Sequence, residues 1–102
     1  MKLAVTFEGM KNEYEDDPIP FNVVSLLWGN LPHEVQAQVV EDGYYGDAWV
    51  GMDYALWYAA HHGLTVPGSL LDEVEDEMNR TKDYCGLVAS ITTLRSAAAQ
   101  AA

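Results

Sequence analysis

The residues of this 102-residue chain that could carry acid–base or metal chemistry are few and widely spaced. Asp53 is the only carboxylate inside a long apolar stretch, and a buried carboxylate is a candidate general acid or base. His61 and His62 are adjacent, and neighbours on a helix point about 100° apart, so they are poorly placed to bind one ion together. His33 has no ligand-like spacing to either, and the HExxH pattern is absent. We expect no metal and no cofactor.

Motifs for nucleophilic catalysis or phosphate binding are also absent. The chain has no G-x-S-x-G, no phosphate loop, no dinucleotide-binding glycine pattern and no Cys–His signature. We predict that the protein is not an enzyme. The alternative hypothesis is that the protein is a small metal-dependent or acid–base enzyme that uses Asp53 with His61 or His62.

Cysteine content and the N-terminus bear on the compartment. Cys85 is the only cysteine, so no intramolecular disulfide can form, and we expect a small buried side chain. The apolar run after Lys2 ends by Glu8, which is too short for a signal peptide, and no transmembrane segment is visible. The expected location is the cytoplasm.

The distribution of carboxylates is the strongest pattern in the sequence. Sixteen Asp and Glu face five Lys and Arg, which gives a formal net charge of -11. This balance argues against direct binding to nucleic acid or to an anionic membrane, because both need a basic surface. It favours a partner with a basic surface. One acidic group lies on a predicted helix and comprises Asp72, Glu73, Glu75, Asp76 and Glu77.

Two further acidic groups lie nearer the N-terminus. One precedes a pair of prolines and comprises Glu13, Glu15, Asp16 and Asp17; the other comprises Glu34, Glu41, Asp42 and Asp47. Ordinary solvated faces mix both signs of charge, and these groups scarcely do. We expect the group over residues 72–77 and the group over residues 13–17 to bind a partner. The tyrosines Tyr14, Tyr44 and Tyr45 are expected to be exposed anchors, because Tyr is favoured at binding hot spots.

A central helix over residues 47–62 must position these groups. Its side chains are apolar or aromatic almost all the way round, which is typical of a buried or membrane-spanning helix. It is shorter than the roughly 20 residues that span a bilayer, so we expect a core helix. Asp47 is expected to cap its start and Gly63 to adopt the left-handed conformation at its end. The small residues Gly51, Ala55 and Ala59 are expected to accept a C-terminal helix.

The remaining segments complete a mainly α-helical bundle of one domain, residues 1–102. Residues 2–7 allow a short strand, and residues 11–20 are predicted as an acidic loop, because Pro18 and Pro20 disfavour helix in the residues before them. Helices are expected over residues 21–28 and 32–41. C-terminal helices are expected over residues 69–99, with Ser69 as a cap. The sequence leaves open whether that last stretch is one helix or two.

In its size, helical pattern and acidic residues 13–17 and 72–77, the chain resembles the small phage-encoded anti-defence proteins, the anti-CRISPR and anti-restriction inhibitors. The likeness is one of size and charge and includes no motif. It implies a stoichiometric inhibitor that acts in the host cytoplasm. Such an inhibitor binds the basic nucleic-acid-binding surface of a CRISPR or restriction complex by imitating phosphate charge.

The milder net charge and ample aromatic core favour an inhibitor that binds through one face over a full mimic of duplex DNA. The alternative among interaction proteins is a helical adaptor or regulatory subunit that docks through an apolar face, with the acids giving only solubility. The sequence leaves the oligomeric state and the partner's identity open.

Overall fold

The computed structural model describes residues 3–82 and 86–101, and those residues form helices joined by short turns, with no strand among them. The prediction of a mainly α-helical domain is confirmed. The elements in chain order are α1 (Phe7–Tyr14), α2 (Pro18–Leu27), the 3-10 helix η1 (Trp28–Asn30), α3 (His33–Tyr44), α4 (Ala48–His61), α5 (Gly68–Thr81) and α6 (Leu87–Ala101).

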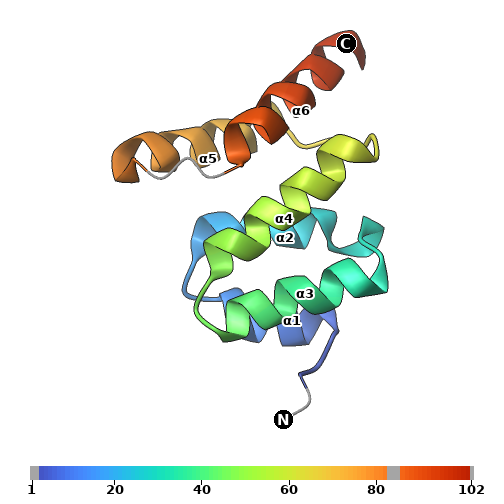
Figure 1. The fold of residues 1–102 in the computed structure, drawn as a ribbon, viewed down its shortest axis with the longest axis vertical. Coiled ribbons are helices and arrows are strands. Elements are labelled where there is room, and N and C mark those ends of the chain that lie inside the picture. Colours follow the sequence, from blue (N-terminus) through green and yellow to red (C-terminus); the bar gives the residue numbers. More distant parts are fainter. Residues whose placement is uncertain (1–2, 83–85, 102) are drawn as a thin grey trace.

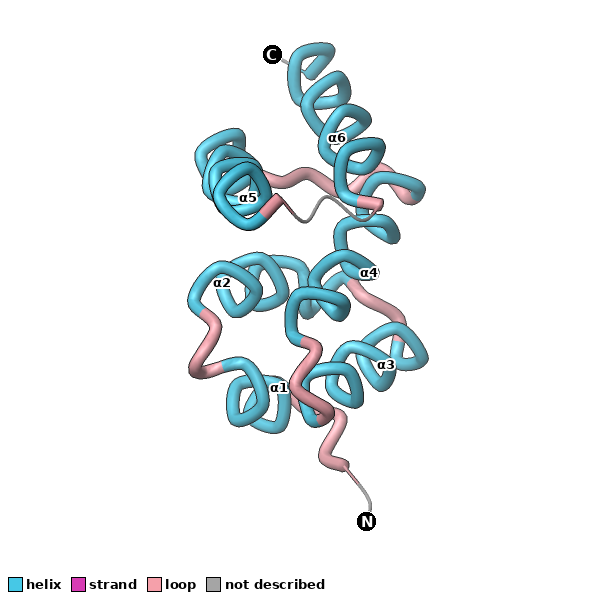
Figure 2. The backbone as a smooth tube through the Cα atoms, turned by 60° about the vertical axis from the view of Figure 1, so that its left-hand side comes forward, coloured by secondary structure: helices cyan, strands magenta, loops and turns pink. Residues whose placement is uncertain are grey.

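The helices stack as three layers of two (Figures 1 and 2). α1 and α3 form one outer layer, α2 and α4 the middle, and α5 and α6 the other outer layer. α4 packs against α2, α3 and α6, so it is the central helix that the sequence predicted. Within residues 3–82 and 86–101, no helix combines the length and the apolar character needed to cross a bilayer.

The N-terminal region differs from the prediction. Residues 3–6 form no strand, and residues 1–2 lie outside the described part of the chain. Thr6 caps α1 instead, because its hydroxyl accepts a hydrogen bond from the Gly9 N–H at 3.0 Å. The predicted acidic loop is also largely wrong. Its start belongs to α1, and Pro18 opens α2, since a proline in the first turn lacks only an N–H that would be unpaired anyway.

The central helix is not buried on every side. Met52 and Leu56 are fully buried, but Val50 and Trp57 are exposed, because the packed neighbours leave one side of α4 open. Asp47 occupies the N-cap position without a side-chain capping bond, whereas Gly63 is left-handed as predicted, with φ +70°.

Gly51, one member of the row of small residues on α4, meets a different partner from the one expected. Gly51 faces Tyr14 of α1, whose hydroxyl would lie 1.9 Å from a β-carbon at position 51. The C-terminal helix α6 does pack on α4, near Asp53, where a β-carbon at Gly86 would lie 3.6 Å from the carboxylate. The glycine therefore accommodates a tyrosine ring rather than a second helix backbone.

The C-terminal part of the chain forms two helices. Lys82 ends α5 in the left-handed conformation, with φ +61°, and α6 begins at Leu87. α5 starts at Gly68, one residue earlier than expected, and Pro67 is its N-cap residue. The Pro67 carbonyl accepts hydrogen bonds from the N–H groups of Leu70 and Leu71, so Ser69 is not the cap. In the sequence, helical spacing predicts one apolar stripe of Leu70, Leu71, Val74 and Met78; the structure buries the last three and leaves Leu70 partly buried.

Candidate interaction surface

The acidic face of α5 is partly neutralised by its neighbour. Arg95 of α6 donates from Nη2 to Asp72 at 2.7 Å and from Nε to Glu75 at 2.8 Å. The hydrogen bond to Glu75, and then that to Asp72, raises the pKa of Arg95 above its ordinary value. Arg80 pairs with Glu77 within α5. Among the described residues, Glu73 and Asp76 are the α5 acids that remain exposed without an ion pair.

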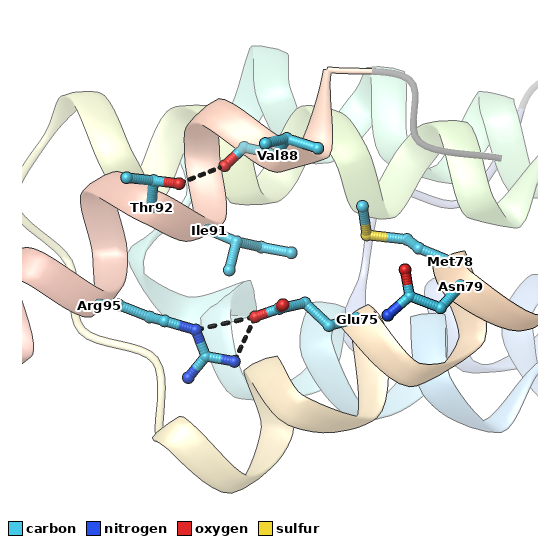
Figure 3. Close-up of a pocket in the computed structure, with 7 residues that line it drawn as sticks. All are labelled: Glu75, Met78, Asn79, Val88, Ile91, Thr92 and Arg95. Carbon is cyan, nitrogen blue, oxygen red and sulfur yellow. Dashed lines mark hydrogen bonds and ion pairs between the residues drawn. The ribbon is translucent and has the colours of Figure 1, made fainter. Parts of the chain in front are cut away.

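A groove of about 270 Å³ lies between α5 and α6 (Figure 3). The Arg95–Glu75 ion pair bridges it, and Met78, Ile91 and Val88 supply its apolar lining. Val88 is 55% exposed, so this apolar side chain of α6 lies outside the core. The groove offers a small apolar surface beside the acids of α5.

Two acidic groups that are separate in sequence come together at one end of the molecule. The turns α1–α2 and α3–α4 lie on the same side of the fold, at the left of Figure 1. Burial, followed by the charges of Asp42 and Asp17, raises the pKa of the Tyr14 hydroxyl above its ordinary value, so both carboxylates lie near one ring. Glu13 packs beside Gly43, where a β-carbon would lie 3.1 Å from that of the glutamate.

Like charges gather around Asp42 at this end. Burial raises the pKa of Asp42, and the charges of Asp47 and Glu41 raise it further, against a lowering by the hydrogen bond from Gln38 at 2.9 Å. We call this region the acidic end; it comprises Glu13, Glu15, Asp16, Asp17, Glu41, Asp42 and Asp47. Within the described part of the chain, none of these carboxylates forms an ion pair. Glu34, at the other end of α3, is exposed.

The three tyrosines expected as anchors fall into two kinds. Tyr14 is fully buried, and its hydroxyl donates to the Val39 carbonyl at 2.7 Å, so the expectation that it is an exposed anchor is wrong. It is buried because Gly43 and Gly51 leave room for its ring. Tyr44 and Tyr45, which follow Asp42 closely in the chain, are 43% and 69% exposed and meet edge to face, with ring centroids 5.1 Å apart.

A cavity of about 190 Å³ lies between the acidic end and α5. Asp17 and Glu77 both line it, together with Trp49 and residues 18–20. The sequence pattern singled out neither Trp49, which looked like part of an all-apolar helix, nor Arg95, which lies far from its acidic partners in sequence. Arg80 was detectable, because it follows Glu77 at the i,i+3 spacing of helix neighbours.

The candidate residues for catalysis are not assembled into one site. His61 Nδ1 lies 2.9 Å from the Trp57 carbonyl oxygen, and its ring lies over Trp57; the His62 ring stacks on Tyr58 with centroids 4.0 Å apart. Asp53 is not a free carboxylate. Across the residues that the structure describes, no group of three His, Cys, Asp or Glu could hold a metal ion. Cys85 lies outside those residues.

Comparison with known proteins adds no relative to this description. No protein-family model, no curated protein and no solved structure matches the chain.

Proposed function

We propose that the protein is a non-enzymatic, acidic interaction protein that binds the basic, nucleic-acid-binding surface of a partner protein. The observation that carries this proposal is the convergence of carboxylates from the α1–α2 turn, the end of α3 and the start of α4, without ion pairs among the described residues. Two exposed tyrosines, Tyr44 and Tyr45, lie between Asp42 and Asp47 in the chain, where α3 ends and α4 begins. The acids supply charge, and the tyrosines supply contact area.

The physical reason for such a surface is electrostatic. Burial, and then the like charges of Asp47 and Glu41, raise the pKa of Asp42, so its ionisation costs folding free energy at neutral pH. A partner lined with Lys and Arg would offset that repulsion, and complementary charge also speeds association. The dependence on charge predicts a complex that weakens as salt rises, since the screening length falls from about 10 Å at 0.1 M to about 3 Å at 1 M.

The partner class that we propose is a defence effector, of the CRISPR or restriction type. The nucleic-acid channel of an effector is basic because it must neutralise phosphates. Occupation of that channel by a stoichiometric acidic protein would block nucleic-acid binding, which is the action of the inhibitors that this chain resembles in size and charge. The proposed setting is the host cytoplasm.

The experiment is affinity capture from bacterial lysate at 0.05 M and 0.5 M salt, with bound proteins identified by mass spectrometry. A nucleic-acid-binding protein that is captured at low salt, and released by high salt or by excess competing DNA or RNA, is the expected result. Two double variants, which change the net charge by the same amount, locate the binding surface. One combines Asp16→Lys with Glu41→Lys at the acidic end, and the other combines Glu73→Lys with Asp76→Lys on α5.

We expect the acidic-end reversal to abolish capture and the α5 reversal to weaken it less. A partner that survives high salt and both reversals would overturn the proposal. It would support instead a helical adaptor that docks through the α5–α6 groove, for which the exposure of Val88 is the favourable observation. That second function predicts loss of capture by Val88→Lys.

A further inference from the structure

A small cavity lies where the α1–α2 turn and helices α2, α4 and α5 meet. Its lining residues are Asp17, Pro18, Ile19, Pro20, Trp49 and Glu77, and its volume is about 190 Å³. Pockets for drug-sized ligands are larger, roughly 300–1,000 Å³. The size therefore suits one side chain rather than a whole cofactor or metabolite.

The lining combines two kinds of surface. Asp17 and Glu77 bring carboxylates from two separate segments, while two prolines, Ile19 and Trp49 are apolar or aromatic. A guanidinium forms strong charge-assisted hydrogen bonds with carboxylates. Its alkyl stem packs on apolar surface, and the face of a tryptophan ring attracts a cation. Together these groups match an arginine side chain.

One further observation bears on a guanidinium at this place. Glu77 already accepts from a guanidinium, that of Arg80, whose side chain is 71% exposed. Exposed pairs of this kind contribute little to stability, so an incoming guanidinium can displace Arg80 from Glu77.

We propose that this cavity binds an arginine side chain of the partner. The inference rests on the proposed function, because it names the residue type through which the basic partner is recognised. Arginine fits better than lysine, since its planar group stacks on aromatic rings and pairs with carboxylates through two parallel bonds. Arg80 then acts as an internal competitor for Glu77.

The test is an NMR titration of the full ¹⁵N-labelled chain with the capped tripeptide acetyl-Gly-Arg-Gly-amide. The Trp49 indole N–H signal, assigned with Trp49→Phe, reports on the cavity. We expect a saturable shift, with at least tenfold weaker binding of the peptides that carry neutral citrulline or lysine in place of arginine. Retained dispersion of the backbone signals shows that each variant is folded.

Matched variants separate the cavity from the general negative field. Glu77→Gln and Asp17→Asn are expected to weaken arginine binding at least fivefold, whereas Asp76→Asn, an equal charge change on the exposed face of α5, leaves it within twofold. Arg80→Gln is expected to strengthen binding about threefold, because it frees Glu77. Lys82→Gln, an equal charge change outside the cavity lining, is expected to have little effect.

Several outcomes would overturn the inference: equal binding of the arginine and citrulline peptides, equal effects of Glu77→Gln and Asp76→Asn, or no shift of the Trp49 signal. If lysate capture is salt-sensitive while the arginine peptide does not bind, the cavity proposal fails and the proposed function stands. If the arginine peptide binds with the expected selectivity and no basic partner is captured, the cavity is confirmed and the proposed function fails.

Discussion

Tyr14 of α1 places its hydroxyl against Gly51 of α4, at a point where a β-carbon would lie 1.9 Å from the phenolic oxygen. The same ring lies against Gly43 of α3, and its hydroxyl donates to the Val39 carbonyl. One buried tyrosine therefore joins three helices. It also lies beneath the acidic end, since Asp17 and Asp42 both act on it.

Gly51→Ala is expected to destabilise the fold. The new methyl group cannot fit without displacing the Tyr14 ring, and overpacking of this kind costs about 1–3 kcal/mol. A gain of up to about 1 kcal/mol in helix propensity offsets part of it. Urea unfolding followed by circular dichroism should show a net loss of about 1–2 kcal/mol. Gly29→Ala, where a β-carbon meets nothing within 4 Å, is the control. Equal stabilities for wild type and Gly51→Ala would contradict this packing.

Tyr14→Phe is expected to cost about 1 kcal/mol, because it removes the hydrogen bond to Val39. It should also lessen the cost of Gly51→Ala, since it removes the atom that the new methyl group meets. The two substitutions are therefore expected to be non-additive by about 0.5–1 kcal/mol in a double-mutant cycle. Additive losses would show that the hydroxyl is not the point of conflict.

Tyr14 also predicts the response to alkaline pH. Its pKa is raised in the folded state, first by burial and then by Asp42 and Asp17, whereas the unfolded chain titrates near 10. The folded state thus holds this proton more tightly, and its stability falls as pH rises above about 10. Urea midpoints measured between pH 8 and 11 should decline less in Tyr14→Phe than in the wild type. Parallel declines would exclude Tyr14 as the source.

Local sequence pattern was sufficient for most of the helices but not for what they meet. The stripe of Leu71, Val74 and Met78 predicts the buried face of α5 because helical spacing alone places these side chains on one side. The N-terminal error has a local cause as well. Thr6 caps α1, and Pro18 lies in the first turn of α2, where a proline is tolerated. Both helices therefore form in a stretch where the polar residues and prolines suggested a loop.

The candidate site was predictable only in part. The acids of residues 13–17 and of the α3–α4 region are visible as charge runs, but nothing local indicates that they share one end of the fold. The burial of Tyr14 depends on gaps at Gly43 and Gly51 in two other helices. In the same way, the pairing of Arg95 with Asp72 and Glu75 depends on how α6 returns beside α5.

The ion pairs of Arg95 predict a salt-dependent link between α5 and α6. Arg95→Met keeps most of the alkyl stem and removes the charge, and it should cost about 1 kcal/mol or less, because the groups are partly exposed. The loss, measured by urea unfolding, should shrink in 1 M NaCl. Arg80→Met, which breaks a pair within α5 alone, is the control and should have a smaller effect. A loss that does not depend on salt would assign the role of Arg95 to packing.

Asp42→Asn is expected to stabilise the protein at neutral pH. Burial, and then Asp47 and Glu41, raise the pKa of Asp42 in the folded state, so ionisation of this carboxyl favours unfolding once pH exceeds its unfolded value near 3.9. Asparagine removes the charge and keeps an oxygen that can accept the bond from Gln38. The urea midpoint of Asp42→Asn should therefore exceed that of the wild type at pH 7, and the two should converge near pH 3.

The matched control for this prediction is Asp16→Asn, an equal charge change at an exposed position of the same acidic end. If relief of general negative charge were the cause, both variants would stabilise the protein equally. If the burial of Asp42 and the local crowding around it are the cause, the Asp42 variant gains more, and its excess disappears at low pH. Because the same crowding is what a basic partner would relieve, Asp42→Asn should also weaken partner capture while it strengthens the fold. A stabilised variant with unchanged capture would place the binding surface elsewhere.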